Sequence, residues 1–129
     1  MSDNQAESSL MSQTGHTAVV KVGGSCFKSI DAMRVCAERI KALSNPVVIV
    51  SAMWGVTDQL VMLADQVAFD DDDEQAALYA TGEQASAAMF AMMLKKTGRQ
   101  AQSFQAWQLG LRSKGSSVEA QPETINVPL

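Results

Sequence analysis

The sequence holds few of the residues on which several classes of protein depend. Its two cysteines, Cys26 and Cys36, are too few for a disulfide framework and lack the spacing of a zinc site. No apolar run approaches the roughly 20 residues that cross a bilayer, and the N-terminus lacks the basic and apolar segments of a secretory signal. We therefore expect a protein of the reducing cytoplasm with no membrane partner.

Basic residues and histidine are also scarce. Ten Lys and Arg face fourteen Asp and Glu, which gives a formal net charge of -4. No basic cluster occurs anywhere in the chain, so we expect no nucleic-acid partner. The one histidine, His16, ends a polar stretch over residues 1–16 that we expect to be a disordered leader. The chain therefore offers no catalytic triad and no evident general base.

What the sequence does contain is an α/β pattern. Residues 17–22 and 47–50 are apolar enough for strands buried on both faces. Between them, helical periodicity runs from Ser29 to Leu43, and Pro46 ends it. Strand, helix and strand of this kind predict a parallel sheet flanked by helices.

The remainder of the chain predicts mainly helix. We expect helices over residues 58–68 and 75–96, a third strand over 100–107, and a loop or irregular hairpin over 110–121. The acidic run 70–74 predicts a solvated loop between helices. Its consecutive carboxylates point in different directions and lack the alternating spacing of a calcium loop, so a metal site is disfavoured.

A glycine turn follows the first strand, in the run Lys21-Val22-Gly23-Gly24-Ser25. Because Gly23 and Gly24 lack a Cβ, a phosphate could approach their backbone closely. The N–H groups at the start of a following helix favour negative charge, and Lys21 would add a positive charge. The alternative is an ordinary tight turn.

Two hydroxyl residues follow the second strand, in the run Ser51-Ala-Met-Trp-Gly-Val-Thr57. Ligands of open parallel sheets bind beyond the carboxyl ends of the strands. Ser51 and Thr57 could therefore face the same crevice as the glycine turn. The alternative is that Thr57 caps the next helix and Ser51 belongs to a turn.

Two further segments could contribute residues to this crevice. In the run of residues 81–84, Thr-Gly-Glu-Gln, a buried Glu83 would need a cationic partner such as a ligand's ammonium group. A capping box between Thr81 and Gln84, with a helix restart or kink, is the structural alternative. The aromatic and polar segment 104–108 could line the same crevice or form an amphipathic strand.

Three of these motifs are the glycine turn, the run 51–57 and the run 81–84. In this order they resemble the motifs of the aspartate kinases, which belong to the amino acid kinase family. The resemblance runs from about Thr17 to Ile125 and implies an incomplete amino acid kinase (carbamate kinase-like) fold. It implies ATP-dependent phosphorylation of the side-chain carboxylate of L-aspartate to 4-phospho-L-aspartate, for lysine, threonine and methionine synthesis. A carboxylate with a pKa of about 3.9 is already ionised at neutral pH, so this reaction needs no general base. It depends on positioning and on charge neutralisation.

The resemblance also implies a role for each motif residue. Lys21 is the implied catalytic residue, because the family lysine contacts the ATP phosphates and stabilises charge during transfer. Glu83 matches a glutamate associated with the substrate amino group. The other implied cofactor-binding residues are Gly23, Gly24 and Ser25, and the other implied substrate-binding residues are Ser51 and Thr57.

Members of the family continue well beyond the length of this chain. We therefore expect residues 17–129 to be the N-terminal, substrate-side part of a kinase domain, with the ATP and Mg²⁺ sites mostly outside the chain. Missing sheet neighbours would leave an exposed edge and apolar faces, so we expect a homo-oligomer or association with a longer kinase chain. The alternatives are another amino acid kinase, or a non-catalytic remnant or regulatory module that pairs with a longer kinase subunit.

Overall fold

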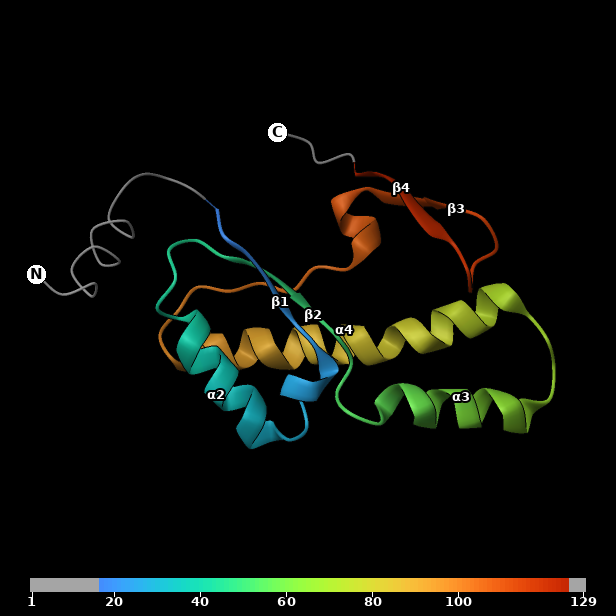
Figure 1. Cartoon of the computed structure of the whole chain (residues 1–129), viewed down its shortest axis with the longest axis horizontal. Coiled ribbons are helices and arrows are strands. Elements are labelled where there is room, and N and C mark those ends of the chain that lie inside the picture. Colours follow the sequence, from blue (N-terminus) through green and yellow to red (C-terminus); the bar gives the residue numbers. More distant parts are fainter. Residues whose placement is uncertain (1–16, 126–129) are drawn as a thin grey trace, which may run out of the picture.

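The computed structural model describes residues 17–125, so the expected disordered leader over 1–16 lies outside the described residues. A two-stranded parallel sheet forms the start of the fold (Figure 1). Strand β1 (Val19–Val22) pairs with β2 (Val47–Val50), and helix α2 (Ile30–Ile40) connects them. The predicted α/β class with a parallel sheet is confirmed.

One face of this sheet builds the core against α2 and α4 (Asp72–Lys96). Phe27 is fully buried in this core, and its ring centroid lies 5.5 Å from that of Phe90 in α4. The strands contribute alternate residues to this face, as the two-residue period of a strand requires. The buried cluster comprises Val22, Phe27, Met33, Ala37, Ile40, Phe90 and Leu94.

The opposite face of the sheet is largely bare. Val19 is 67% exposed, Val47 50% and Ile49 52%, and these three residues alternate with the inward-facing ones. The prediction that both strands are buried on both faces is therefore wrong. Both α2 and α4 pack against the same face, so the apolar side chains of the other face have little to cover them.

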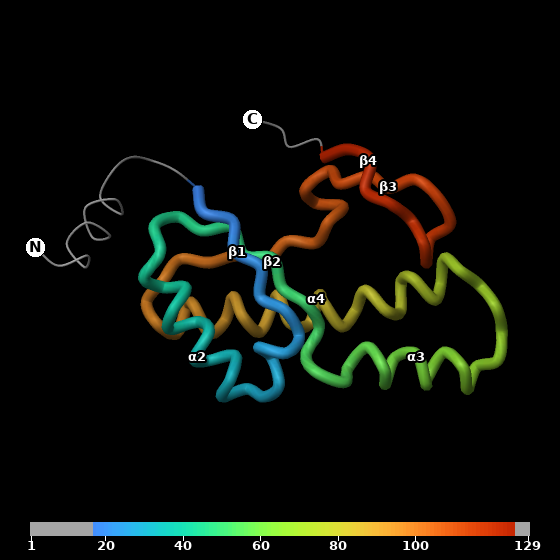
Figure 2. Tube along the Cα trace, in the orientation of Figure 1, coloured from blue at the N-terminus to red at the C-terminus, as the bar shows by residue number. Residues whose placement is uncertain are grey.

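Helix α3 (Val56–Val67) lies alongside α4, and a short turn joins them (Figures 1 and 2). The predicted solvated loop over residues 70–74 is wrong for most of its length. Asp71 is the N-cap of α4 and accepts hydrogen bonds from the N–H groups of Asp73 (3.1 Å) and Glu74 (3.0 Å). Carboxylates in the first turn complement the positive end of the helix dipole, so this acidic run begins a helix.

The C-terminal part contains no third parallel strand in the described residues. The backbone is extended without strand pairing from residue 101 to 105 and then forms a 3-10 turn, η2 (Ala106–Leu109), so the predicted strand over 100–107 is wrong (Figure 2). Strands β3 (Leu111–Lys114) and β4 (Gln121–Ile125) then pair in an antiparallel hairpin with a register shift. This confirms the irregular hairpin expected there.

No helix among residues 17–125 is both long enough and apolar enough to span a bilayer.

Candidate active site

The glycine turn leaves β1 at its carboxyl end and forms a single 3-10 turn, η1 (Gly24–Cys26). The first hydrogen bond of the turn runs from the N–H of Cys26 to the Gly23 carbonyl, at 2.9 Å. The N–H groups of Gly24 and Ser25 come before this donor in the chain. Lys21 is exposed in β1, two residues before the turn. The turn thus offers early backbone donors, and Lys21, opposite Ile49 on the exposed side of β1, carries a positive charge two residues earlier in the chain.

Helix α2 does not follow the glycine turn directly. Helix α2 begins only at Ile30, and its N-cap Ser29 accepts a hydrogen bond from the N–H of Ala32 at 3.1 Å. Residues 27–29 therefore separate the glycine turn from the helix. The N–H groups that directly follow the glycines are therefore those of η1, and the first turn of α2, where the helix dipole acts, begins further along the chain.

Ala52, just beyond β2, joins the three motifs. A Cβ built on Gly24 would lie 3.2 Å from the carbonyl oxygen of Ala52, so the glycine turn approaches the Ala52 backbone closely. On its other side, the Ala52 N–H donates to Oε1 of Glu83 at 3.4 Å. The residues around Ala52 are held in place as well, because the N–H of Trp54 donates to the Phe27 carbonyl at 3.1 Å.

Helix α4 approaches Ala52 through Gly82, which is buried. A Cβ built on Gly82 would lie 3.0 Å from Cβ of Ala52 and 3.3 Å from Cγ1 of Val56. The helix is continuous here, and the Thr81 hydroxyl donates to the Leu78 carbonyl at 2.6 Å, so the interpretation of a restart or kink is wrong. The glycine serves close packing, which places the next residue, Glu83, beside the end of β2.

Glu83 is exposed, so the premise of a buried carboxylate is wrong. Its carboxylate has the Ala52 N–H on one oxygen and is otherwise open to a ligand. Ser51 is half-buried. Its N–H donates to the Val22 carbonyl at 3.1 Å and so continues the hydrogen bonding between β1 and β2. Ser51 and Glu83 therefore both adjoin Ala52 at the carboxyl end of β2.

Thr57 is exposed in the first turn of α3. The interpretation of Thr57 as the helix cap is wrong, because Gly55 is the N-cap, with a φ of 78°. The Thr57 hydroxyl takes no part in the contacts that join the glycine turn, Ala52 and Glu83.

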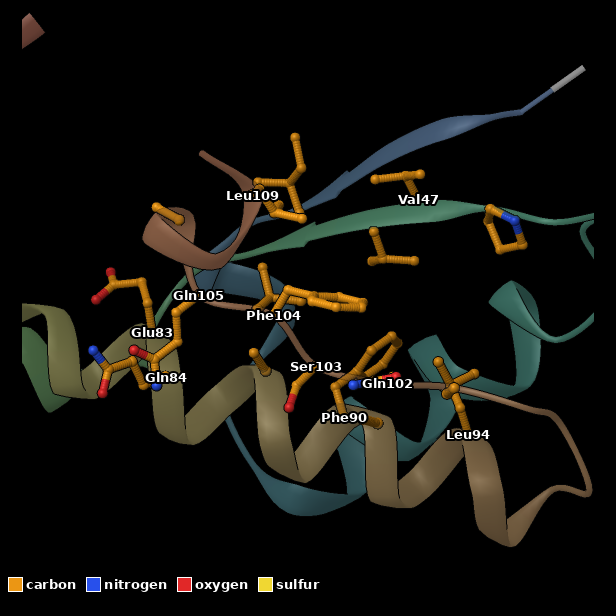
Figure 3. A pocket seen from close by; sticks show the side chains of 18 of the residues that line it. Val47, Glu83, Gln84, Phe90, Leu94, Gln102, Ser103, Phe104, Gln105 and Leu109 are labelled. Atoms are coloured by element: carbon orange, nitrogen blue, oxygen red, sulfur yellow. The ribbon is translucent and has the colours of Figure 1, made fainter. Parts of the chain in front are cut away.

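A groove of about 840 Å³ lies between β2, α4 and the segment that follows α4 (Figure 3). Glu83 and the aromatic segment at Phe104 both line it, but the glycine turn, Lys21, Ser51 and Thr57 do not, so it is not the shared crevice that the sequence predicts. Its lining is mainly apolar and includes the whole of β2, whose outer edge pairs with no strand of the described residues. The lining residues that Figure 3 labels are Val47, Glu83, Gln84, Phe90, Leu94, Gln102, Ser103, Phe104, Gln105 and Leu109.

The sequence reasoning missed two features of this region. Nothing in the sequence marks Ala52, because an alanine side chain carries no functional group and the role of Ala52 depends on its backbone. Lys28 places its ammonium 5.6 Å from the ring centroid of Trp54, which is 66% exposed. The sequence signal for this pair is a large aromatic residue, Trp54, in the loop that follows the second apolar run.

The described residues fit a phosphate better than a metal. A Cβ built on Gly23 meets nothing within 4 Å, so the space next to Gly23 is open to a ligand. Residues 17–125 contain no group of three or more His, Cys, Asp or Glu side chains that could hold a metal ion. Mg²⁺ in phosphate-transferring sites is commonly held by one or two carboxylates together with the substrate phosphates, so these residues alone do not define its site.

The parallel sheet with its crossover helix, and the glycine turn at the carboxyl end of its first strand, define an α/β protein. The chain belongs to the amino acid kinase family, whose model matches residues 16–129. Within that family the chain is similar to aspartokinases. It is 35% identical over 119 residues to the aspartokinase of Rickettsia felis, and that match covers 86% of this chain and 30% of the relative. It is 38% identical over 101 residues to the aspartokinase of Geobacillus stearothermophilus, covering 74% of this chain and 25% of the relative.

A solved structure gives the same result. The aspartate kinase from Synechocystis is 36% identical and superposes with a TM-score of 0.58, over 62% of this chain and 15% of that one. The resemblance to aspartate kinases is therefore confirmed. The chain spans less than a third of the length of each of these relatives.

Proposed function

We propose that residues 17–129 form the N-terminal, substrate-side part of an aspartate kinase. The reaction transfers the γ-phosphoryl group of ATP to the side-chain carboxylate of L-aspartate and gives 4-phospho-L-aspartate. The observation that carries this proposal is the position of Ala52, which approaches Gly24 with its carbonyl and binds Glu83 with its N–H. A phosphate-type turn and a carboxylate are thereby held at the same end of the sheet.

Lys21 and the glycine turn form the phosphate side of this site. The exposed ammonium of Lys21 neutralises charge on the transferring phosphoryl group, and Gly23 leaves the backbone accessible. The N–H groups of Gly24 and Ser25 add donors. Phosphoryl transfer depends mainly on such positioning and electrostatic stabilisation, and Mg²⁺ bound with ATP would supply further charge neutralisation. The rest of the ATP and Mg²⁺ sites belongs to parts of the kinase beyond these residues.

Glu83 and the hydroxyl residues form the substrate side. The exposed Glu83 carboxylate pairs with the ammonium group of aspartate, and its hydrogen bond from Ala52 fixes its orientation. Ser51 and Thr57 donate their hydroxyls to the aspartate carboxylates. The attacking carboxylate is already ionised at neutral pH, so the site requires no general base.

The bare sheet face and the apolar groove support the proposal that activity requires further protein to cover these surfaces. Val47 and Ile49 are half exposed, and the apolar side chains of β2 line the groove along that strand. We propose that the remainder of a cytoplasmic kinase covers these surfaces, and that the 129-residue chain alone has little activity. The same surfaces support a second candidate, a non-catalytic module that pairs with a longer kinase subunit.

Activity of the complete natural polypeptide that carries this sequence tests the proposal. ADP release should require L-aspartate, and L-glutamate should not replace it. Lys21→Ala should lower kcat by about 100-fold or more, the scale on which single charge-stabilising groups act in catalysis. Lys95→Ala, at the exposed end of α4, is the matched control and should retain activity. Full activity of the Lys21 variant, or no dependence on aspartate, would overturn the proposal.

A further inference from the structure

The two cysteines of the chain lie together beside the glycine turn, although ten residues separate them in sequence. Cys26 is the last residue of η1, and Cys36 lies in the second half of α2. The thiol of Cys36 approaches the carbonyl oxygen of Cys26, with its Sγ at 3.9 Å. Helix α2 therefore brings the Cys36 thiol close to the backbone of Cys26.

The two thiols also act on each other. Burial raises the pKa of the Cys36 thiol, and the charge and hydrogen bonding of the Cys26 side chain raise it further, while Arg39 opposes the rise. Cys26 is exposed and Cys36 is half-buried. A small oxidant in solution therefore meets Cys26 first, and Cys36 is placed to react second.

We propose that Cys26 and Cys36 form a reversible intramolecular disulfide when the protein meets a peroxide. The Cys26 thiolate attacks one peroxide oxygen, the O–O bond breaks, and the departing hydroxide takes a proton to become water. The sulfur of Cys36 then attacks the resulting sulfenic acid. The S–S bond forms, the S–O bond breaks, and a second water leaves with the Cys36 proton. Two thiols are oxidised by two electrons, and hydrogen peroxide is reduced to two waters.

Such a pair is suited to a reducing compartment, where thiols are the resting state and a dithiol reductant reverses the bond by exchange. Its position gives it a consequence for the glycine turn. Cys26 directly follows Ser25, so a bond to Cys36 ties the end of η1 to the body of α2. On the basis of the proposed function, this tether weakens phosphate binding at the turn.

The test is intact-mass analysis of the purified chain. Reduced protein is exposed to hydrogen peroxide, denatured, and treated with a thiol-alkylating reagent. The proposal predicts a monomer that has lost two hydrogens, carries no alkyl group, and accepts two alkyl groups again after dithiothreitol treatment. Because the chain has only these two cysteines, any internal disulfide must join them. Two alkylated thiols, a disulfide-linked dimer, or further oxidation of both sulfurs without a bridge would overturn it.

Two variants separate the roles of the thiols. Cys36→Ser should stop at the sulfenic acid of Cys26, which dimedone traps as an adduct. Cys26→Ser should give several-fold less adduct under the same conditions, because its remaining thiol is half-buried. Equal trapping in both variants would overturn the order of attack. These readouts need no kinase activity. A complete natural polypeptide that fails to phosphorylate aspartate, while the chain forms the disulfide, contradicts the proposed function alone.

Discussion

The backbone N–H of Ala52 donates a hydrogen bond to the carboxylate of Glu83, 3.4 Å away, and so links the end of β2 to the middle of α4. The two residues are 31 positions apart in sequence. Packing at the buried Gly82 makes this approach possible. The link leaves the rest of the Glu83 carboxylate free for a ligand at the strand end, where the glycine turn also lies.

The first prediction concerns Glu83 as the partner of the substrate ammonium group. In the complete natural polypeptide, Glu83→Gln keeps an oxygen for the Ala52 N–H but loses the negative charge. Charged hydrogen bonds contribute about 1.5–3 kcal/mol, so the KM for aspartate should rise by roughly 10- to 100-fold. Steady-state kinetics should show the KM for ATP unchanged. Glu74→Gln, in the first turn of the same helix, is the control, and an unaltered KM for aspartate in Glu83→Gln would rule out the assigned role.

The second prediction concerns the close packing at Gly82. Gly82→Leu would push side-chain atoms against Ala52 and Val56, which already lie within 3.3 Å of a built Cβ. Overpacking of this kind costs about 1–3 kcal/mol, so urea denaturation should show a free energy of unfolding lower by that amount. Ala85→Leu adds a side chain at an exposed position of the same helix and should change stability by less than about 0.5 kcal/mol. Equal effects of the two substitutions would contradict the packing described here.

The third prediction concerns the start of α4. Asp71→Ala removes the acceptor for two backbone N–H groups of the first turn. The free energy of unfolding should fall by about 1 kcal/mol, the usual loss for an N-cap. Asp70→Ala, one residue earlier and outside the helix, keeps the cap and should have little effect in the same denaturation experiment. A larger loss from the Asp70 substitution would show that the cap is misassigned.

The fourth prediction concerns Ser86, whose hydroxyl is fully buried and has no hydrogen-bond partner within the described residues. An unsatisfied buried hydroxyl is costly, so Ser86→Ala should raise the free energy of unfolding by about 1 kcal/mol. The better helix propensity of alanine accounts for at most about 0.5 kcal/mol of that gain. A loss of stability on thermal or urea unfolding would mean that the hydroxyl has a partner in solution.

The fifth prediction concerns the bare face of the sheet. Sedimentation of the 129-residue chain should show association that grows with concentration, because apolar residues of β1 and β2 are exposed together. Ile49→Lys, at the centre of that face, should shift the chain toward monomer. Ile30→Lys replaces an isoleucine of similar exposure, 45% against 52%, on α2 and should leave association unchanged. A monomeric unmodified chain at all concentrations would contradict the prediction.

The sequence predicted those parts of the fold that local pattern determines. The apolar runs of β1 and β2 and the helical period between them were sufficient for the parallel unit, because each pattern lies within one element. Burial of both strand faces was not predictable in this way. An apolar run shows what a strand is able to bury, whereas coverage of Val19 and Ile49 depends on which elements pack against them.

Other errors have equally physical causes. The acidic run suggested a loop, but Asp71 caps a helix whose dipole favours the carboxylates that follow. The segment around Phe104 has the alternation of a strand, yet pairing requires a neighbour that the pattern itself cannot supply. The motifs predict the candidate site, and its residue roles stay a prediction. The role of the Ala52 backbone and the approach of Cys26 to Cys36 arise from tertiary packing alone.

The most direct test of the central claim is to identify the phosphorylated carboxylate. The complete natural polypeptide is incubated with ATP and L-aspartate, and borohydride reduces any acyl phosphate to an alcohol. Phosphorylation of the side-chain carboxylate gives homoserine, and this account predicts homoserine in the wild type and its loss in Lys21→Ala. Reduction to 3-amino-4-hydroxybutyrate would show transfer to the α-carboxylate, and no reduced product would show no transfer to aspartate. Either result would contradict the account.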